Sequence, residues 1–380
     1  MQFIRKQFDK LKPTFEKGGK LSPLGSLFDA IETLFFVPNK TSKSGIHIHD
    51  SKDSKRLMII VVIAMVPALL FGMWNTGNQH FLSINETVPF WETFWYGFLK
   101  VLPIIIVSYA VGLGLELVFA QLRGHEVKEG FFVSGMLIPL IVPVGTPLWM
   151  VAIATAFAVI IGVEAFGGAG MNILNPALTA RAFLFFAYPS HMSGDVVWIA
   201  EKADGFSGAT PLAEAAAGHI GNLPSALDMF YGFIPGSIGE TSTLAILIGA
   251  AILLYTGVAS WKIILSTAIG GLSMGLIFNA FAANQFMEIP AYYHLIMGGF
   301  AFGAVFMATD PVSAAQTSRG KYIYGFLIGF MAVLIRVLNP AYPEGMMLAI
   351  LLMNVFAPLI DHYVVQANIK RRLKRASVKA

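Results

Sequence analysis

Apolar runs alternate with short polar stretches over most of this 380-residue chain. Ten such runs follow one another, at 57–74, 98–122, 131–145, 147–166, 177–188, 244–260, 262–283, 293–308, 322–338 and 345–364. Several of them approach the length of about 20 residues that a helix needs to cross a bilayer. The pattern therefore predicts an all-α polytopic membrane protein with about ten transmembrane helices.

The third, fifth and eighth runs are too short for a plain spanning helix, and glycine and proline flank them. Short segments of this kind indicate helices that break within the membrane. Such breaks are tolerated only where protein or a cavity satisfies the freed backbone groups. We therefore expect a polar or hollow interior beside these three segments.

Composition narrows the classes of protein. With 56% hydrophobic and 13% charged residues, the chain is too apolar for a water-soluble fold of this length. It has no cysteine, which excludes thiolate-ligated iron–sulfur clusters, thioether-linked haem and disulfides. The eight histidines show no metal-ligand spacing, and there is no phosphate loop or dinucleotide fingerprint. No metal site and no nucleotide site are therefore expected in this chain.

The distribution of positive charge predicts the topology. With the N-terminus inside, inner loops and tails hold 22 of the 26 Lys and Arg residues, as the positive-inside rule requires. Because lipid and topology explain these charges, we expect no nucleic-acid partner. The predicted organisation is a cytoplasmic N-terminal segment (1–56), a first five-helix half (57–188), an external loop (189–243), a second five-helix half (244–364) and a basic cytoplasmic tail (365–380). Within the first segment, apolar residues at helical spacing over 24–36 predict a short amphipathic helix.

An internal repeat supports two halves. Leu174-Asn175-Pro176-Ala177 recurs as Leu338-Asn339-Pro340-Ala341, and a proline at 147 recurs at 311 with the same offset of 164 residues. The predicted topology places the two copies on opposite sides of the membrane, which indicates inverted five-helix repeats meeting at a midplane site. The alternative is that Asn-Pro begins a helix in both copies by chance.

Charged residues within the apolar runs are candidate functional groups. Glu116 lies in an otherwise apolar span, where a carboxylate costs about 2.5–3.5 kcal/mol and is expected to face a cavity or a cation. Alternatively, it pairs with Arg123 or reaches the interface. For Glu164, Asp310 and Asp361, near span ends, we expect interfacial solvation or helix capping. Arg181 and Arg336, at the broken helices, are expected to satisfy freed carbonyls or an anionic group.

The external loop contains a reactive hydroxyl among small residues. Residues 204–210 read Asp-Gly-Phe-Ser-Gly-Ala-Thr, so Gly208 and Ala209 remove bulk beside the Thr210 hydroxyl and leave it accessible to a modifying enzyme. Taken alone, Ser-Gly-Ala-Thr is also typical of an ordinary polar turn.

These motifs together resemble a known family. Six stretches carry the resemblance: Gly-Gly-Lys at 18–20, His-Asp-Ser-Lys-Asp-Ser-Lys-Arg-Leu-Met at 49–58, Arg-Gly-His-Glu at 123–126, Glu-Gly-Phe-Phe-Val at 129–133, residues 174–189 and Ser-Gly-Ala-Thr at 207–210. They are similar to motifs of the B subunits of sodium-translocating NADH:quinone oxidoreductases. The resemblance covers essentially the whole chain and extends to the equivalent subunit of the Rnf-type complex.

The resemblance implies cofactors and site residues. A flavin transferase would esterify FMN to Thr210, with Asp204, Ser207, Gly208 and Ala209 as the recognition motif. A noncovalent riboflavin would also be held, by stacking and amide hydrogen bonds, for which the region of Asn172 and Asn175 is the candidate. Glu116 matches an acidic position that the family links to sodium uptake.

The resemblance also implies partners and a location. An NADH-binding flavin and iron–sulfur subunit and a second subunit with covalent FMN would deliver electrons, and quinone would accept them, in the bacterial inner membrane. Two alternatives stay open. One is the Rnf-type subunit, against which the long N-terminal tail argues; the other is a channel or secondary transporter without redox chemistry, which inverted repeats suit equally well.

Overall fold

A computed structural model gives the fold of the chain. It describes residues 2–15, isolated positions between 19 and 36, and residues 54–123, 130–339 and 343–377. Within these residues all regular structure is helical. The helices are α1 (Gln2–Phe15), α3 (Ser54–Ser83), α4 (Phe90–Arg123), α5 (Gly130–Ile141), α6 (Leu148–Phe157), α7 (Pro176–Ala187), α8 (Pro211–Ala216), α9 (Ala226–Tyr231), α10 (Thr243–Tyr255), α11 (Trp261–Phe281), α12 (Tyr293–Ile296), α13 (Phe300–Phe302), α14 (Ser318–Leu338) and α15 (Met346–Ser377).

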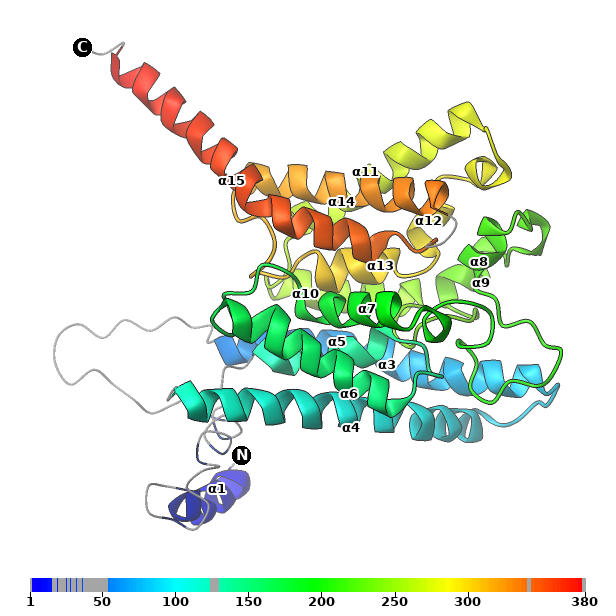
Figure 1. The fold of residues 1–380 in the computed structure, drawn as a ribbon, viewed down its shortest axis with the longest axis horizontal. Coiled ribbons are helices and arrows are strands. Elements are labelled where there is room, and N and C mark those ends of the chain that lie inside the picture. The colour runs from blue at the N-terminus through cyan, green and yellow to red at the C-terminus, as the bar shows by residue number, and fades with distance from the viewer. Residues whose placement is uncertain are drawn as a thin grey trace.

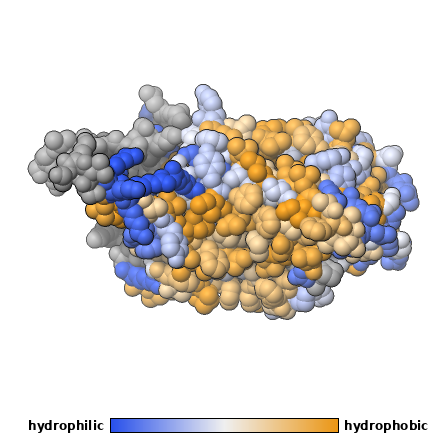
Figure 2. All heavy atoms as spheres, turned by 90° about the horizontal axis from the view of Figure 1, so that it is seen from above, coloured by the Kyte–Doolittle hydropathy of each residue, from blue (hydrophilic) through white to orange (hydrophobic). Residues whose placement is uncertain are grey.

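Six helices in the described part of the chain are long and apolar enough to cross a membrane: α3, α4, α6 with its continuation to Phe166, α11, α14 and α15. Three shorter apolar helices, α5, α7 and α10, stand beside them. This arrangement confirms a polytopic, all-helical membrane protein. The visible face of the bundle carries an apolar band between two hydrophilic ends, as a lipid-facing surface requires (Figure 2).

The short apolar runs form short or interrupted helices. α5 and α7 have 12 residues each, and the eighth apolar run is divided into α12, α13 and a π-helix at Gly303–Met307. A second π-helix at Ala158–Val163 continues α6 and leads into a 3₁₀ turn at Glu164–Phe166. π-Helical turns leave the regular i→i+4 ladder and are frequent at functional sites.

Several helices are longer than the hydrophobic pattern predicts, among them α3, α4 and α15, which continues to Ser377 although its apolar run ends at 364. α3 continues to Ser83 and α4 begins at Phe90, whereas the apolar runs end at 74 and begin at 98. The extra turns of α3 carry polar side chains that are buried, among them Asn75 and Gln79. Asn75 donates a hydrogen bond to the Ile234 carbonyl at 2.9 Å, so α3 extends beneath the 189–243 segment.

The two ends of the bundle differ. The start of α3, the end of α4 and the end of α15 lie at one end, on the left in Figure 1, while α8 and α9 of the 189–243 segment lie at the opposite end. The basic residues that close α4 and α15 therefore lie away from the segment that contains Thr210.

The helix contacts follow the same order in both parts of the chain. α4 packs against α5 and α6, and α6 against α7; likewise α11 packs against the 303–307 π-helix and α14, and α14 against α15. Small residues allow α11 and α14 to approach closely: a methyl group at Gly329 would lie 1.9 Å from the Thr267 carbonyl oxygen.

The two Asn-Pro motifs have different local roles. Asn175 is the N-terminal cap of α7, where its side chain accepts a hydrogen bond from the Leu178 N–H. Asn339 instead caps the C-terminus of α14, and the next described helix starts at Met346. In the described residues, therefore, only the first copy forms a helix start.

The N-terminal segment contains a helix that the hydrophobic pattern did not predict, α1. The amphipathic helix predicted at 24–36 lies outside the described residues except for a few positions. Of these, Phe28 stacks on Phe15 with ring centroids 4.6 Å apart, and Glu32 pairs with Lys12 at 2.8 Å.

Candidate functional site

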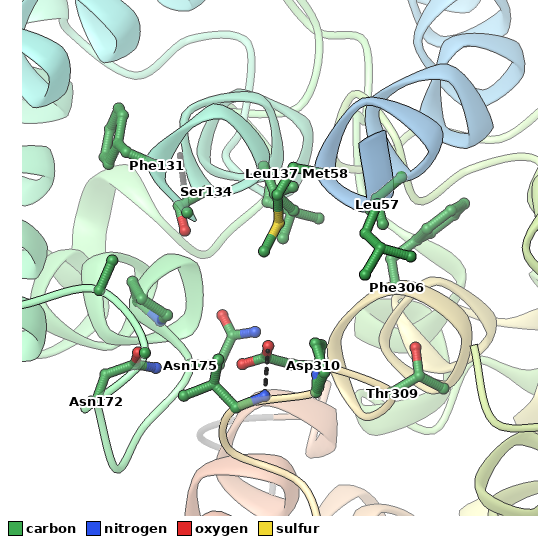
Figure 3. Close-up of a pocket in the computed structure, with 18 of the residues that line it drawn as sticks. Leu57, Met58, Phe131, Ser134, Leu137, Asn172, Asn175, Phe306, Thr309 and Asp310 are labelled. Atoms are coloured by element: carbon green, nitrogen blue, oxygen red, sulfur yellow. Dashed lines mark hydrogen bonds between the residues drawn. The ribbon is translucent and has the colours of Figure 1, made fainter. Parts of the chain in front are cut away.

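A cavity of about 520 Å³ lies near the end of the bundle that holds the start of α3 and the ends of α4 and α10. The starts of α5 and α7 and residues 306–312 complete its walls (Figure 3). Sites for small organic ligands typically measure about 300–1,000 Å³. The cavity is therefore large enough for a cofactor.

Its walls differ in chemistry. Figure 3 shows apolar and aromatic side chains on one side, namely Leu57, Met58, Phe131, Leu137 and Phe306. Asn172, Asn175, Thr309 and Asp310 lie on the other side. An apolar cavity with a few convergent polar groups is the usual form of a ligand site.

The structure brings Asn172 and Asn175, the two candidate amides, together on one wall. Both side chains are buried. Asn175 Oδ1 accepts from the Leu178 N–H at 3.2 Å, and Asn172 Nδ2 donates to the Leu174 carbonyl at 2.9 Å. Each amide is oriented by a local bond that uses only part of its hydrogen-bonding capacity.

Glu116 lines the same cavity from α4 and is only 5% exposed. This is the environment expected for a carboxylate in an apolar span. Arg123, seven residues later, forms a 2.7 Å ion pair with Glu164 and donates to its carbonyl at 3.0 Å. The expectation that Glu164 is solvated at the interface or caps a helix is wrong, since its side chain is buried in this pair.

The other two acidic residues bind backbone N–H groups of the turn before α14 and are not themselves helix caps, since Thr317 caps α14. Asp310 accepts from the Val312 N–H at 3.2 Å and from the Ser313 hydroxyl at 2.7 Å, the first of which is drawn in Figure 3. Burial raises the pKa of Asp310 above its ordinary range. Asp361 of α15 accepts from the Gln316 and Thr317 N–H groups just before α14.

Thr210 lies at the opposite end of the bundle from the cavity. It is the N-terminal cap of α8, where its Oγ1 accepts from the Ala213 N–H at 3.2 Å. Its side chain is half-buried, while Asp204 and Ser207 are exposed. Gly208 is required by close packing, because a methyl group there would lie 2.5 Å from the Asp195 carbonyl oxygen.

Two side chains of α4 bind Glu201, which precedes the Asp204–Thr210 motif by three residues. Lys100 and Tyr96 both donate hydrogen bonds to the Glu201 carboxylate. These bonds, the one from Lys100 above all, hold the pKa of Glu201 below its usual range. The polypeptide three residues before Asp204 is thereby fixed to the membrane body.

Both predicted arginines lie within helices; Arg181 binds anionic groups, and Arg336 binds carbonyls of the interrupted segment between α12 and α13. Arg181 of α7 pairs with the carboxylates of Glu240, at 2.9 Å, and Glu344. Arg336 donates to the carbonyls of His294 at 2.7 Å and Met297 at 3.2 Å. Glu240 and Glu344 were not predicted as partners, because they lie in polar segments with no local sign of a buried cation.

Comparison with known proteins decides the family. The family model described as NQR2, RnfD, RnfE matches residues 41–370. The chain belongs to the NQR2, RnfD, RnfE family. The resemblance noted from the sequence motifs is thereby confirmed.

Individual relatives cover almost the entire chain. The B subunit of the Na(+)-translocating NADH-quinone reductase of Chromohalobacter salexigens is 50% identical over 98% of this chain and 96% of its own. The B subunits of Ectopseudomonas mendocina, also 50% identical, and Pseudomonas aeruginosa, 48% identical, each match over 98% of this chain and 99% of their own length. Both candidate sites lie within the region that the family model matches.

Proposed function

We propose that this chain is the B subunit of a sodium-translocating NADH:quinone reductase, a membrane component of a redox-driven sodium pump. The observation that carries the proposal is the 50% identity to a relative of that name over 98% of the chain. The Rnf-type subunit shares the family, but the B-subunit relatives match nearly end to end, including most of the N-terminal segment. A channel or transporter without redox chemistry lacks this support.

Thr210 is the proposed attachment residue for FMN, through a phosphoester. The local structure fits this chemistry: the hydroxyl is half-buried at a loop-to-helix junction, and the two residues before it, Gly208 and Ala209, carry no large side chain that would cover it. The esterified oxygen still has lone pairs with which to accept from the Ala213 N–H. The cap of α8 can therefore survive the modification.

The 520 Å³ cavity is the proposed riboflavin site. Phe131 and Phe306 offer aromatic surface, and Asn172 and Asn175 offer amide donors and acceptors. A flavin without phosphate needs only these interactions. When bound, the two flavins supply reversible electron transfer between NADH, oxidised on a partner subunit, and quinone.

Glu116 is the proposed sodium ligand of this chain. It shares the cavity with Asn172 and Asn175, so a bound cation and a bound flavin would be neighbours. Coupling requires that the site bind sodium with different affinity in the two redox states, since equal affinity would shift no equilibrium. A carboxylate beside a group that changes charge meets this requirement.

The arrangement of the halves supports a transport function. The helix contacts recur in the same order, and α4 and α11 run in opposite directions along the bundle (Figure 1). We propose ten membrane segments forming two inverted five-helix repeats, 57–188 and 244–364. Inverted repeats with broken helices typically hold an ion or small ligand at their interface.

The chain is proposed to work within a larger complex. We place it in the bacterial inner membrane with both tails cytoplasmic and Thr210 external, on the basis of the charge asymmetry. Because the sequence contains no nucleotide-binding motif, NADH oxidation belongs to a partner with flavin and an iron–sulfur centre. A second subunit with covalent FMN would deliver electrons to Thr210.

In-gel fluorescence tests the proposal. The complex is purified from its native membrane, denatured, separated by electrophoresis and viewed under ultraviolet light. The band of this chain should fluoresce, and Thr210→Ala should abolish that signal, while the matched control Thr241→Ala, in the same part of the structure, should keep it. A dark wild-type band would favour the non-redox alternative.

A further inference from the structure

A group of buried charges lies beneath Thr210. Arg181 of α7 is 4% exposed and forms ion pairs with Glu240 and Glu344. Arg336 of α14 is fully buried and donates to the Glu344 carbonyl at 3.3 Å. Burial raises the pKa of Glu240 to about 7, while the Arg181 guanidinium acts in the opposite direction. Glu240 therefore depends on its partner to stay charged.

This group surrounds a broken helix. α12 ends at Ile296 and α13 starts at Phe300, which frees backbone carbonyls between them. Arg336 satisfies the carbonyls of His294 and Met297. The break is thus a stable, preformed feature of the second half of the chain.

Two side chains contact the break, Glu240 and, from the Thr210 segment, Leu212. A methyl group at Gly299 would lie 2.4 Å from Glu240 Oε1, so the carboxylate rests directly on that glycine. Gly298, with φ of +60°, has no room for a side chain because Leu212 Cδ1 would lie 2.4 Å from its methyl group. Leu212 follows Thr210 by two residues. The two adjacent glycines of the break therefore leave room for Leu212 and Glu240, which lie side by side on it.

Little free space remains in this contact. Thr210, Leu212, Glu240, Gly298 and Glu344 line a cavity of only about 20 Å³, enough for about one water molecule. The Thr210 segment and Glu240 therefore lie next to each other against the break, with almost no free volume between them. Arg181, in the first half of the chain, supplies the positive charge that compensates Glu240, which lies in the 189–243 loop.

We propose that Arg181 is a positioning residue that holds the Thr210 segment on the helix break by neutralising Glu240. The proposal rests on the proposed function, in which Thr210 bears a flavin. Asn175, the N-terminal cap of α7, lines the 520 Å³ cavity, and Arg181 follows about 9 Å further along the helix axis. One short helix therefore leads from this cavity to the charged group beside the Thr210 segment. A shift of that segment would change the distance between the two candidate flavin sites, on which the rate of electron transfer depends.

The first test needs no flavin. Amide hydrogen exchange is measured on the intact complex in a Thr210→Ala background, for peptides covering 208–216 and 232–242. Arg181→Gln should speed exchange in both peptides at least tenfold, because a buried carboxylate without its counter-charge leaves the break. Arg123→Gln, which breaks the Arg123–Glu164 pair at the opposite end of the bundle, is the matched control and should leave both peptides unchanged.

A rescue variant separates neutralisation from simple packing. Adding Glu240→Gln to Arg181→Gln removes the charge of Glu240, the more deeply buried of the two carboxylates that face Arg181, so exchange should return to within about threefold of the parent. A role in packing alone predicts faster exchange still. Gly299→Ala displaces Glu240 without changing any charge and should reproduce the fast exchange. Unchanged exchange in Arg181→Gln, or a double variant faster than the single one, overturns the proposal.

The second test uses the chain with Thr210 restored. Arg181→Gln should keep its fluorescent band in the gel while electron transfer from the Thr210 flavin slows at least tenfold in stopped-flow measurements. A dark wild-type band would refute the flavin on Thr210 and leave the exchange result standing. A fluorescent Arg181→Gln band with wild-type electron transfer would refute the positioning role alone.

Discussion

Arg336→Met should destabilise the protein more than any other single arginine substitution in α14. The Arg336 side chain is completely buried and donates to three backbone carbonyls, those of His294, Met297 and Glu344. Methionine has a similar length and no polar atoms, so it fills the space but satisfies none of the carbonyls. The substitution therefore isolates the hydrogen-bonding contribution to the helix break.

The magnitude follows from the three carbonyls. A buried acceptor left without a donor costs about 1–3 kcal/mol, so three of them give a loss of about 3 kcal/mol even at the lower bound. For a large domain, this corresponds to a fall in the midpoint of thermal unfolding of roughly 5 °C or more. The unfolding midpoint of Arg336→Lys should lie between those of the wild type and Arg336→Met, because an ammonium is a point charge that cannot span three separate acceptors.

The assay is thermal unfolding of the purified complex in detergent, followed by size-exclusion chromatography of the surviving protein. Arg319→Met is the matched control: it changes the same residue type in the same helix, but Arg319 is exposed, so an effect within about 0.5 kcal/mol is expected. If Arg336→Met unfolds at a temperature indistinguishable from that of Arg319→Met, the guanidinium does not stabilise the break.

Three further predictions concern the sites. Glu116→Gln should raise the half-saturating sodium concentration of turnover about tenfold, equivalent to about 1.4 kcal/mol, whereas the exposed Glu86→Gln should not; an unchanged value removes Glu116 from the ion path. Asn172→Leu should lower the amount of flavin that acid releases from the purified complex by at least half, while the fluorescence of the Thr210 band in the gel stays unchanged. An amount of released flavin equal to that of the wild type would argue against the cavity as the riboflavin site. Gly208→Ala should reduce flavin attachment at Thr210 severalfold, since its methyl group would meet the Asp195 carbonyl at 2.5 Å; equal fluorescence in the gel would show that the transferase tolerates a displaced loop.

The membrane architecture was predictable because it rests on hydropathy and charge, which are local properties. The short runs at 131–145 and 177–188 correspond to α5 and α7, and the run at 293–308 to the α12–α13 break. Helix ends were less predictable. α3 continues past its apolar run because Asn75 finds a partner at Ile234, 159 residues away, and no local pattern reports such a partner.

Some residues of the candidate sites could be predicted from the sequence, and others could not. Glu116 stands out in sequence because a carboxylate in an apolar span is costly, and the structure places it in the cavity with Asn172 and Asn175. Glu240 and Glu344 give no such signal, since each occupies a segment where acidic residues are ordinary. Only the fold shows that both pair with Arg181. Glu164 was misjudged for the same reason: its partner Arg123 is 41 residues distant.

The central claim, that this chain carries a covalent flavin, is tested most directly by mass spectrometry of the peptide containing Thr210. The chain is isolated from the assembled complex, digested, and the peptide is fragmented to locate any modification. The account predicts that Thr210 bears the mass of one FMN less one water. An unmodified Thr210 in the mature complex would contradict it.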